Sequence, residues 1–165
     1  DKNGLIAKSG KTNELILNQA LENFTINFGD SLDIKDFDIS FVRGLSLEDG
    51  AATLIHLTAG LISEGLSQFM LKNYPTEENI LTRATILICG GGRKNKYLIE
   101  IIQKYLSNTN IKLKNIDDFG FDGDFIESKA FAYLAIRSYL GLPISFPETT
   151  RCKDPTVGGD INKNF

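Results

Sequence analysis

The chain has 165 residues, 42% of them hydrophobic and 24% charged, which is the balance of an ordinary globular protein. This length can bury a sizeable core, and we expect one domain over residues 1–165. A net charge of −3 and a pI near 5.2 argue against nucleic-acid and anionic-membrane partners, which favour a basic face.

The sequence shows no targeting or membrane-spanning pattern, and it has few of the cysteines and histidines that commonly bind metals. No apolar run approaches the roughly 20 residues that span a bilayer, and no signal-peptide pattern is present, so we expect a cytoplasmic protein without a membrane partner. The two cysteines, Cys89 and Cys152, are too few for a disulfide framework or a four-ligand zinc site. We interpret Cys89 as a small core residue and Cys152 as a free thiol, with a disulfide between them as the less favoured alternative. The only histidine, His56, lies among apolar and small residues and is interpreted as structural.

The beginning of the chain predicts a short helix followed by a loop. Thr12 is expected to cap the helix. Four apolar residues follow at helical spacing: Leu17, Ala20, Leu21 and Phe24. From Asn23 to Val42 no period holds, but aromatic residues are frequent, so we expect an ordered loop.

A long helix is predicted next. Ser46-Leu-Glu-Asp49 is a capping-box pattern that opens a helix reaching about Leu71, and Tyr74-Pro75 ends it. Glycine costs roughly 1 kcal/mol against alanine in a helix interior. The helix nevertheless carries three glycines, which predict close packing against another element or a kink: Gly50, Gly60 and Gly65.

The stretch from Ala84 to Leu98 is the main candidate for a binding site, and we interpret the rest of the chain as the structure that holds it in place. It opens with a β-branched and apolar run, breaks at Gly90, Gly91 and Gly92, and resumes with helical spacing. We expect a buried strand, a glycine turn and a helix N-terminus, a construction in which phosphate or nucleoside lies against the main chain. Arg93 and Lys94 are expected to add positive charge. The alternative is a flexible turn that binds nothing. A dinucleotide fingerprint is excluded, because Asn95 stands where its third glycine belongs.

A helix, a strand and a turn are predicted after the glycines. Apolar residues from Leu98 to Leu106 follow the pattern of an amphipathic helix, and residues 111–116 alternate as a half-buried strand does. A turn-rich connection follows over residues 117–123, and the motif Asp122-Gly-Asp124 lies at its end. This motif lacks the spaced acids and the terminal glutamate of a calcium loop, so we predict no metal site.

A second capping-box pattern, Asp124-Phe-Ile-Glu127, opens the last predicted helix. Residues 130–136 are apolar on every face, so this helix is expected to be central. Gly141 ends it, and a tail without regular structure follows. The Glu127 carboxylate could orient a substrate hydroxyl or accept a proton. Position alone favours the alternative, in which it only caps a backbone N–H.

Three segments together resemble the C-terminal half of the anhydro-N-acetylmuramic acid kinase family. They are Ile88-Cys-Gly-Gly-Gly-Arg-Lys-Asn95, Asp122-Gly-Asp-Phe-Ile-Glu-Ser-Lys-Ala-Phe-Ala-Tyr-Leu-Ala135 and Leu142-Pro-Ile-Ser-Phe-Pro-Glu-Thr-Thr150. The opening residues 1–10 and the Gly158-Gly159 pair are similar too, so the resemblance runs essentially the length of the chain. The glycines are shared by many sugar kinases and actin-like ATPases, whereas the Glu127 helix with its following Pro-Ile-Ser-Phe-Pro segment is far more specific.

The resemblance implies an α/β fold, the C-terminal lobe of an actin-like ATPase (ribonuclease H-like) fold, helix-rich with a small sheet. It implies an enzyme that uses ATP to open the 1,6-anhydro ring of anhydro-N-acetylmuramic acid with water while phosphorylating O6, in bacterial peptidoglycan recycling. Carried over by residue, the nucleotide is bordered by Gly90, Gly91, Gly92 and Asn95. Glu127 faces the sugar, and Mg²⁺ is held mainly through ATP and the missing half.

Departures from the family pattern support a second hypothesis. The family's catalytic aspartate would lie upstream of Asp1, which suggests a chain cut from a longer protein whose N-terminal lobe is a partner. We therefore assign no catalytic residue here. Phe28-Gly-Asp-Ser31 replaces an expected Pro-Pro-Lys-Ser, and Arg151 replaces a usual glycine. The alternatives are a degenerate actin-like module that binds nucleotide or a partner without catalysis, and a nucleotide-sensing regulatory domain. A homodimer is left open.

Overall fold

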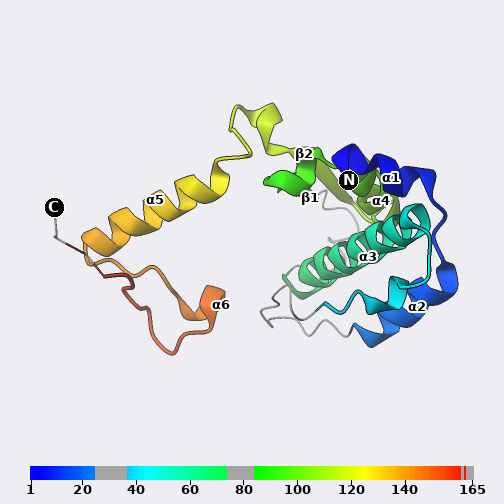
Figure 1. The fold of residues 1–165 in the computed structure, drawn as a ribbon. Helices are drawn as coiled ribbons and strands as arrows, with labels where there is room; N and C mark the ends of the chain where they lie inside the picture. The colour runs from blue at the N-terminus through cyan, green and yellow to red at the C-terminus, as the bar shows by residue number, and fades with distance from the viewer. Residues whose placement is uncertain (25–36, 74–83, 161, 163–165) are drawn as a thin grey trace.

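The computed structural model describes residues 1–24, 37–73, 84–160 and 162 (Figure 1). In chain order the described helices and strands are α1 (Leu5–Ser9), α2 (Glu14–Asn23), α3 (Leu47–Asn73), β1 (Ala84–Ile88), α4 (Lys96–Tyr105), β2 (Ile111–Asn115), α5 (Ile126–Tyr139) and α6 (Pro147–Thr150). Short 3₁₀ helices add η1 (Lys2–Gly4), η3 (Ser40–Val42), η5 (Gly91–Lys94) and η6 (Ile116–Phe119).

The two described strands form a small parallel sheet with α4 as the crossover between them. Ala84 pairs with Ile111 at one end of the ladder, and Ile88 pairs with Asn115 at the other. This confirms the predicted strand, helix and strand. Side chains of β1 alternate between partly buried and exposed, so the prediction of a buried strand was wrong. Only one face of β1 is covered by the described residues, because the core lies on that side.

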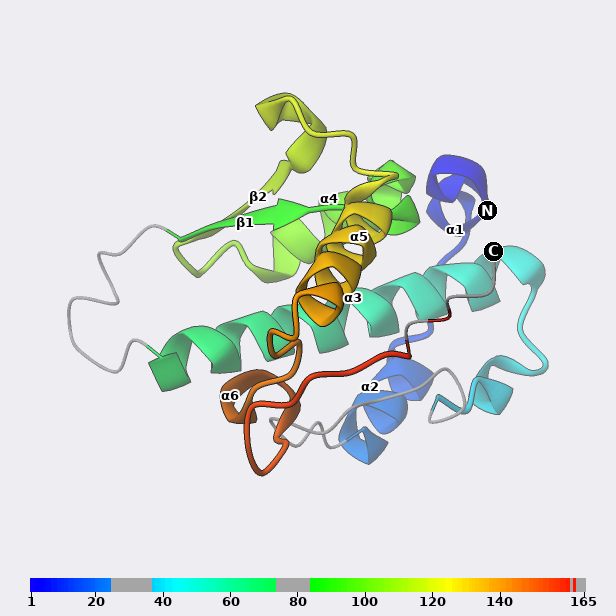
Figure 2. The same ribbon diagram turned by 90° about the vertical axis from the view of Figure 1, so that its left-hand side faces the viewer.

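The main core lies where α3 and α4 pack against the sheet. Its buried members are Ala59 of α3, Ile101, Ile102 and Leu106 at and after α4, and Ile111 of β2. The amphipathic pattern predicted for α4 places these residues on one side of the helix. Figures 1 and 2 both show the strands and α4 together on one side of α3.

Helix α2 packs on the opposite flank of α3. Leu17, Ala20 and Leu57 form a second buried cluster there. The N-cap of α2 is Asn13, whose side chain accepts a hydrogen bond from the Ile16 N–H at 3.1 Å, so the prediction of Thr12 as the cap was wrong by one residue. Asparagine is at least as good a cap as threonine, and here it is the extended residue next to the helix.

Helix α3 follows the predicted course from Leu47 to Asn73. The Ser46 hydroxyl accepts the Asp49 N–H at 3.1 Å, but the Asp49 carboxylate accepts the Lys11 N–H at 2.7 Å. Only half of the predicted capping box is therefore formed. A Cβ atom added at Gly60 would lie 3.2 Å from Leu21, which confirms close packing at that glycine. The predicted Tyr74-Pro75 stop and most of the predicted 23–42 loop lie outside the described residues.

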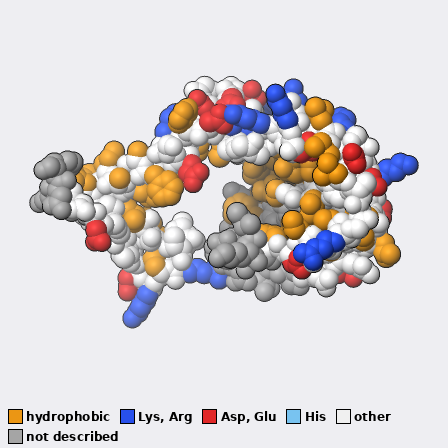
Figure 3. Space-filling model, viewed as in Figure 1, with side chains coloured by type: hydrophobic (Ala, Val, Ile, Leu, Met, Phe, Trp, Pro, Cys, Tyr) orange, Lys and Arg blue, Asp and Glu red, His pale blue; other side chains and the backbone are white. Residues whose placement is uncertain are grey.

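Helix α5 is not the central buried helix that its sequence predicts. None of its residues is buried, and Phe131 keeps 64% of its surface exposed. Figure 1 shows α5 and α6 apart from the α1–α4 body, and hydrophobic side chains gather on the surface over α5 (Figure 3). A helix that is apolar on every face needs neighbours on several sides, which the described residues do not provide.

The tail and the cysteines also differ from expectation. The predicted irregular tail contains α6 and an antiparallel bridge between Ser145 and Thr156. Cys89 is exposed rather than in the core, because it continues the alternation of β1 on the uncovered face. Both cysteines are free thiols, as the favoured interpretation had it. In the described part of the chain no helix combines the length and apolar character needed to cross a bilayer.

Candidate functional site

The glycine turn, residues Gly90–Gly92, joins β1 to α4 through the 3₁₀ helix η5. Gly90 has φ 75° and ψ −179°, a backbone conformation that essentially only glycine adopts. Its N–H donates to the Gly123 carbonyl at 2.9 Å, and its carbonyl accepts the Arg93 N–H. Helix α4 begins only at Lys96, so Gly91 and Gly92 lie in the 3₁₀ helix η5 and not at the predicted helix N-terminus.

The surface over Gly91 and Gly92 is open. A Cβ atom added at either residue would meet nothing within 4 Å, and both glycines are exposed. Within the described part of the chain, neither of their N–H groups donates a hydrogen bond to the backbone or to a side chain. Main chain with free donors and no side-chain bulk suits the close approach of a polar ligand such as a phosphate or a nucleoside.

Arg93 does not contribute free positive charge to this turn, contrary to prediction. Its guanidinium donates to the Asp117 carboxylate (Nε to Oδ2, 2.9 Å), to Asp124 (Nη1 to Oδ1, 2.6 Å) and to the Gly90 carbonyl (2.9 Å). The side chain is 5% exposed. Lys94 pairs with the other Asp124 oxygen at 2.5 Å but is 60% exposed. These four residues, Arg93, Lys94, Asp117 and Asp124, form what we call the Arg93 cluster.

Electrostatics keep the Arg93 cluster ionised. The hydrogen bond from Arg93, followed by that from Lys94, lowers the pKa of Asp124 to about 2. The pKa of Asp117 is also lowered, first by the Arg93 guanidinium and then by the Gly123 N–H. The two carboxylates in turn raise the pKa of Arg93. The positive charge of Arg93 is therefore matched by two acids that stay charged at neutral pH.

Gly123 is buried at the centre of the Arg93 cluster. Its N–H donates to Asp117 Oδ1 at 2.7 Å, and its carbonyl receives the Gly90 N–H. A Cβ atom at Gly123 would lie 2.5 Å from Arg93 Nε and 2.9 Å from Asp117 Oδ1. The glycine of the Asp122-Gly-Asp124 motif is thus required by packing, and the motif holds the glycine turn in place.

Asn95, predicted to border a nucleotide, is the N-cap of α4. Its side-chain oxygen accepts the Leu98 N–H at 3.0 Å. Asn95 directly follows the 3₁₀ helix η5. An asparagine at this position supplies a hydrogen-bond acceptor for the first N–H groups of the helix, which have no acceptor within it. Because the side-chain oxygen is used in capping, only the NH₂ group of the Asn95 side chain could bind a ligand.

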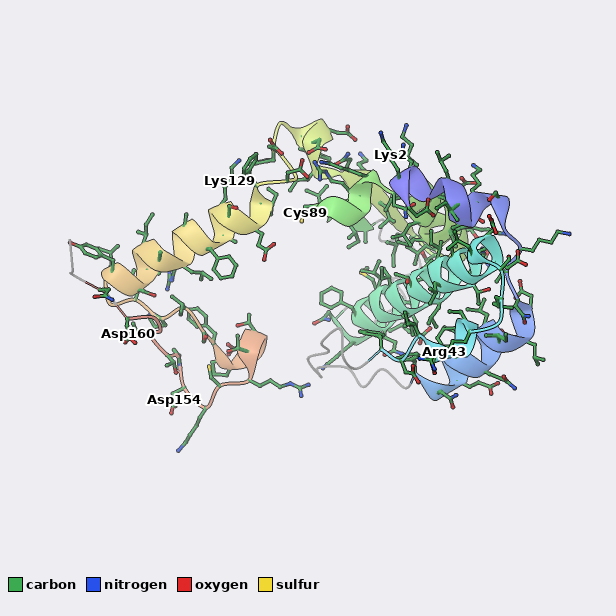
Figure 4. All side chains as sticks on the ribbon, viewed as in Figure 1. Lys2, Arg43, Cys89, Lys129, Asp154 and Asp160 are labelled. Carbon is green, nitrogen blue, oxygen red and sulfur yellow. The ribbon has the colours of Figure 1, made fainter. Side chains whose placement is uncertain are left out.

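Glu127 lies in the first turn of α5 and is exposed. The second capping-box prediction was wrong, because Phe125 is the N-cap residue, no side chain caps the helix, and the Asp124 carboxylate bonds to Arg93 and Lys94. Among the described residues the Glu127 carboxylate has no hydrogen-bond or ion-pair partner. Figure 4 labels Cys89 and Lys129, which mark the strand end before the glycine turn and the first turns of α5.

No local sequence pattern predicts the Arg93 cluster. Asp117 and Asp124 lie 24 and 31 residues from Arg93 along the chain, so no local period or motif joins them. The one available signal was an arginine directly after the glycines with several acids in the next loop, which is too common a pattern to be specific.

The described residues do not form a magnesium site. No three acids, histidines or cysteines among them come together as metal ligands. Asp117 and Asp124, which lie against the glycine turn, are both engaged by Arg93. We therefore assign no residue of this chain to Mg²⁺ and derive no step through it.

A glycine turn with free backbone donors between a parallel strand and a helix is a construction that many nucleotide- and phosphate-binding α/β proteins share. Comparison with known proteins narrows this class. The sequence model of the anhydro-N-acetylmuramic acid kinase family matches residues 1–164. The chain belongs to this family, as the resemblance of its motifs implied.

Relatives named anhydro-N-acetylmuramic acid kinase cover nearly the whole chain. The one from Pelagibacter ubique is 53% identical over 169 residues, which is 100% of this chain and 43% of the relative. Those from Caulobacter vibrioides and Rhizobium rhizogenes are each 36% identical over 163 residues, or 98% of this chain and 40% of the relative. The chain therefore spans about two fifths of the length of the curated relatives it matches.

Proposed function

We propose that this chain is the C-terminal, ATP-binding lobe of an anhydro-N-acetylmuramic acid kinase with an actin-like ATPase fold. The complete enzyme would use ATP and water to open the 1,6-anhydro ring of the sugar and phosphorylate its O6, in peptidoglycan recycling in the bacterial cytoplasm. Family membership supports the reaction. The helix-rich arrangement around a small parallel sheet is compatible with such a lobe.

The nucleotide is proposed to lie on the glycine turn. The observation that carries this placement is the open surface at Gly91 and Gly92, whose N–H groups have no acceptor within the described part of the chain. Gly90 gives the turn its shape, and Asn95, whose side-chain oxygen caps α4, is proposed to border the nucleotide through its NH₂ group. Phosphoryl transfer depends mostly on positioning and electrostatics, so an approachable and well-fixed backbone is what this lobe would contribute.

Glu127 is proposed to face the sugar. Its carboxylate is exposed at the start of α5, and the chain supplies no partner for it among the described residues. An unpaired carboxylate at such a position can accept a hydrogen bond from a sugar hydroxyl. The general base is expected in the N-terminal lobe of the same protein. A homodimer stays an untested prediction.

Substitution of Gly91 by valine tests the placement of the nucleotide. In the full-length protein we expect Gly91→Val to lower ATP affinity by at least tenfold, because branched carbons would occupy the surface where the ligand lies. The fold should be retained, since the new Cβ meets nothing within 4 Å. Gly65→Val is a matched control, because Gly65 also borders open space but lies on α3. Unchanged calorimetric ATP affinity in Gly91→Val would refute the placement.

The alternative, a module that binds nucleotide without catalysis, was motivated by departures such as Arg151. Arg151 has φ 56° and ψ 23°, the left-handed conformation that a glycine adopts without strain. The backbone at this position is therefore one that a glycine would also adopt. Phosphorylation of the anhydro sugar by the complete protein separates the two functions, because a binding module would take up ATP without transferring phosphate.

A further inference from the structure

The Arg93 cluster joins two segments of the chain that carry different parts of the proposed site. Arg93 follows the glycine turn, whereas Asp117 and Asp124 belong to the connection between β2 and α5. Asp124 precedes Glu127 by one short turn. We propose that Arg93 is a positioning residue that fixes the glycine turn relative to Glu127, so that bound ATP and sugar are held at a reactive spacing. This inference rests on the proposed function.

The contacts of Arg93 suit this role. One guanidinium bonds to both Asp117 oxygens (2.9 and 3.3 Å), to Asp124 and to the Gly90 carbonyl, so it touches the turn and the connection at the same time. The same Asp117 carboxylate accepts the Gly123 N–H, and the Gly123 carbonyl accepts the Gly90 N–H. The two segments are thus cross-linked through side chains and through the backbone.

Burial separates Arg93 from an ordinary surface ion pair. Exposed pairs contribute little and are screened by salt. The Arg93 side chain is 5% exposed, although its partners Asp117 and Asp124 are 40% and 44% exposed, whereas Lys94, which shares Asp124, is 60% exposed. Gly123 is packed against the guanidinium so closely that it has no room for a Cβ atom. A lysine at position 93 could not replace the arginine, because one ammonium group does not present the planar fork that holds two carboxylates.

Kinetics of the full-length protein test the proposal. A displacement of about 1 Å between reacting groups can cost about 10²-fold in rate. We expect Arg93→Gln and Arg93→Lys to lower kcat for sugar phosphorylation by roughly 10- to 100-fold while the Kd for ATP changes by less than about threefold. The matched control is Lys8→Gln, which removes an exposed cation paired with Glu100 outside the Arg93 cluster and should change both quantities by less than about twofold. Wild-type kcat in Arg93→Gln, or full rescue by Arg93→Lys, would overturn the proposal. A parallel loss of ATP affinity would also overturn it, because Arg93 would then act on the nucleotide.

Amide hydrogen exchange separates failure of this proposal from failure of the proposed function. Arg93→Gln should speed exchange at Gly90, Gly123 and Lys129, whose N–H bonds lie in the turn, the connection and the first turn of α5, and leave α3 unchanged. Unchanged exchange at Lys129 overturns the coupling even if the wild type proves inactive, whereas an inactive wild type refutes the kinase. If Arg93→Gln does not fold, Asp117→Asn serves instead, since it removes one charge but keeps an acceptor for Gly123. It should show the same kcat loss and the same exchange pattern.

Discussion

At the scale of single residues, glycine has a different purpose at each position around the site. Gly90 is required by its backbone conformation, since its φ of 75° and ψ of −179° exclude other residues. Gly123 is required by packing against Arg93. Gly91 and Gly92 are required by neither within the chain, because a Cβ atom there would meet nothing within 4 Å. The proposed placement of the nucleotide makes use of the open surface at these two glycines.

Stability measurements should separate these purposes. Gly90→Ala should lower the free energy of unfolding by about 1–3 kcal/mol, because alanine would be forced into a glycine-only conformation. Gly91→Ala should stay within about 0.5 kcal/mol of wild type, as expected of an open surface position. Urea denaturation of the two variants, monitored by circular dichroism, provides the measurement. Equal losses in both variants would show that the turn is held by something other than the backbone of Gly90.

At the scale of elements, the sequence predicted best where local pattern and tertiary packing agree. The period of α4 was confirmed because its apolar side meets the core formed with α3 and β2. The first capping box failed at its third-position acid, because Asp49 bonds to Lys11, 38 residues away. The second failed at its cap, because Asp124 bonds to Arg93, 31 residues away. An acid near a helix start has several possible acceptor roles, and only the fold decides between them. The glycine turn was therefore predictable, whereas the Arg93 cluster that supports it was not.

The loop between β2 and α5 should weaken in acid. The pKa of Asp124 is about 2 in the folded chain, below the roughly 3.9 of a free aspartate, and the pKa of Asp117 is lowered as well. A lowered pKa in the folded state gives stabilisation that is complete above about pH 4 and is lost as the pH falls toward 2. We expect Asp124→Asn to be less stable than wild type at neutral pH and to lose less stability between about pH 4 and 2.

Urea denaturation at a series of pH values measures this difference. The control is Asp122→Asn, because the Asp122 carboxylate accepts only the neighbouring Asp124 N–H in the described structure and does not pair with Arg93. It should keep the steeper acid dependence of the wild type. Identical pH profiles for wild type and Asp124→Asn would contradict the ionised state that we assign to the Arg93 cluster.

At the scale of the whole molecule, stability lies in the α1–α4 body and the sheet. The buried side chains belong to α1 to α4 and the segments next to them, whereas α5 contributes none. This explains why hydrophobic composition misled the prediction for α5. Sequence shows that a helix has apolar faces, but it does not show whether the same stretch of chain supplies the surfaces that cover them.

Two truncations of large apolar side chains compare these regions. Leu106 is 1% exposed in the main core, so Leu106→Ala should cost about 2–5 kcal/mol of unfolding free energy. Phe131 is 64% exposed on α5, so Phe131→Ala in the 165-residue chain should stay within about 0.5 kcal/mol of wild type. Urea denaturation followed by far-ultraviolet circular dichroism compares the two variants. A cost at Phe131 similar to that at Leu106 would mean that α5 is covered in solution, by a second copy of the chain if the cost rises with protein concentration.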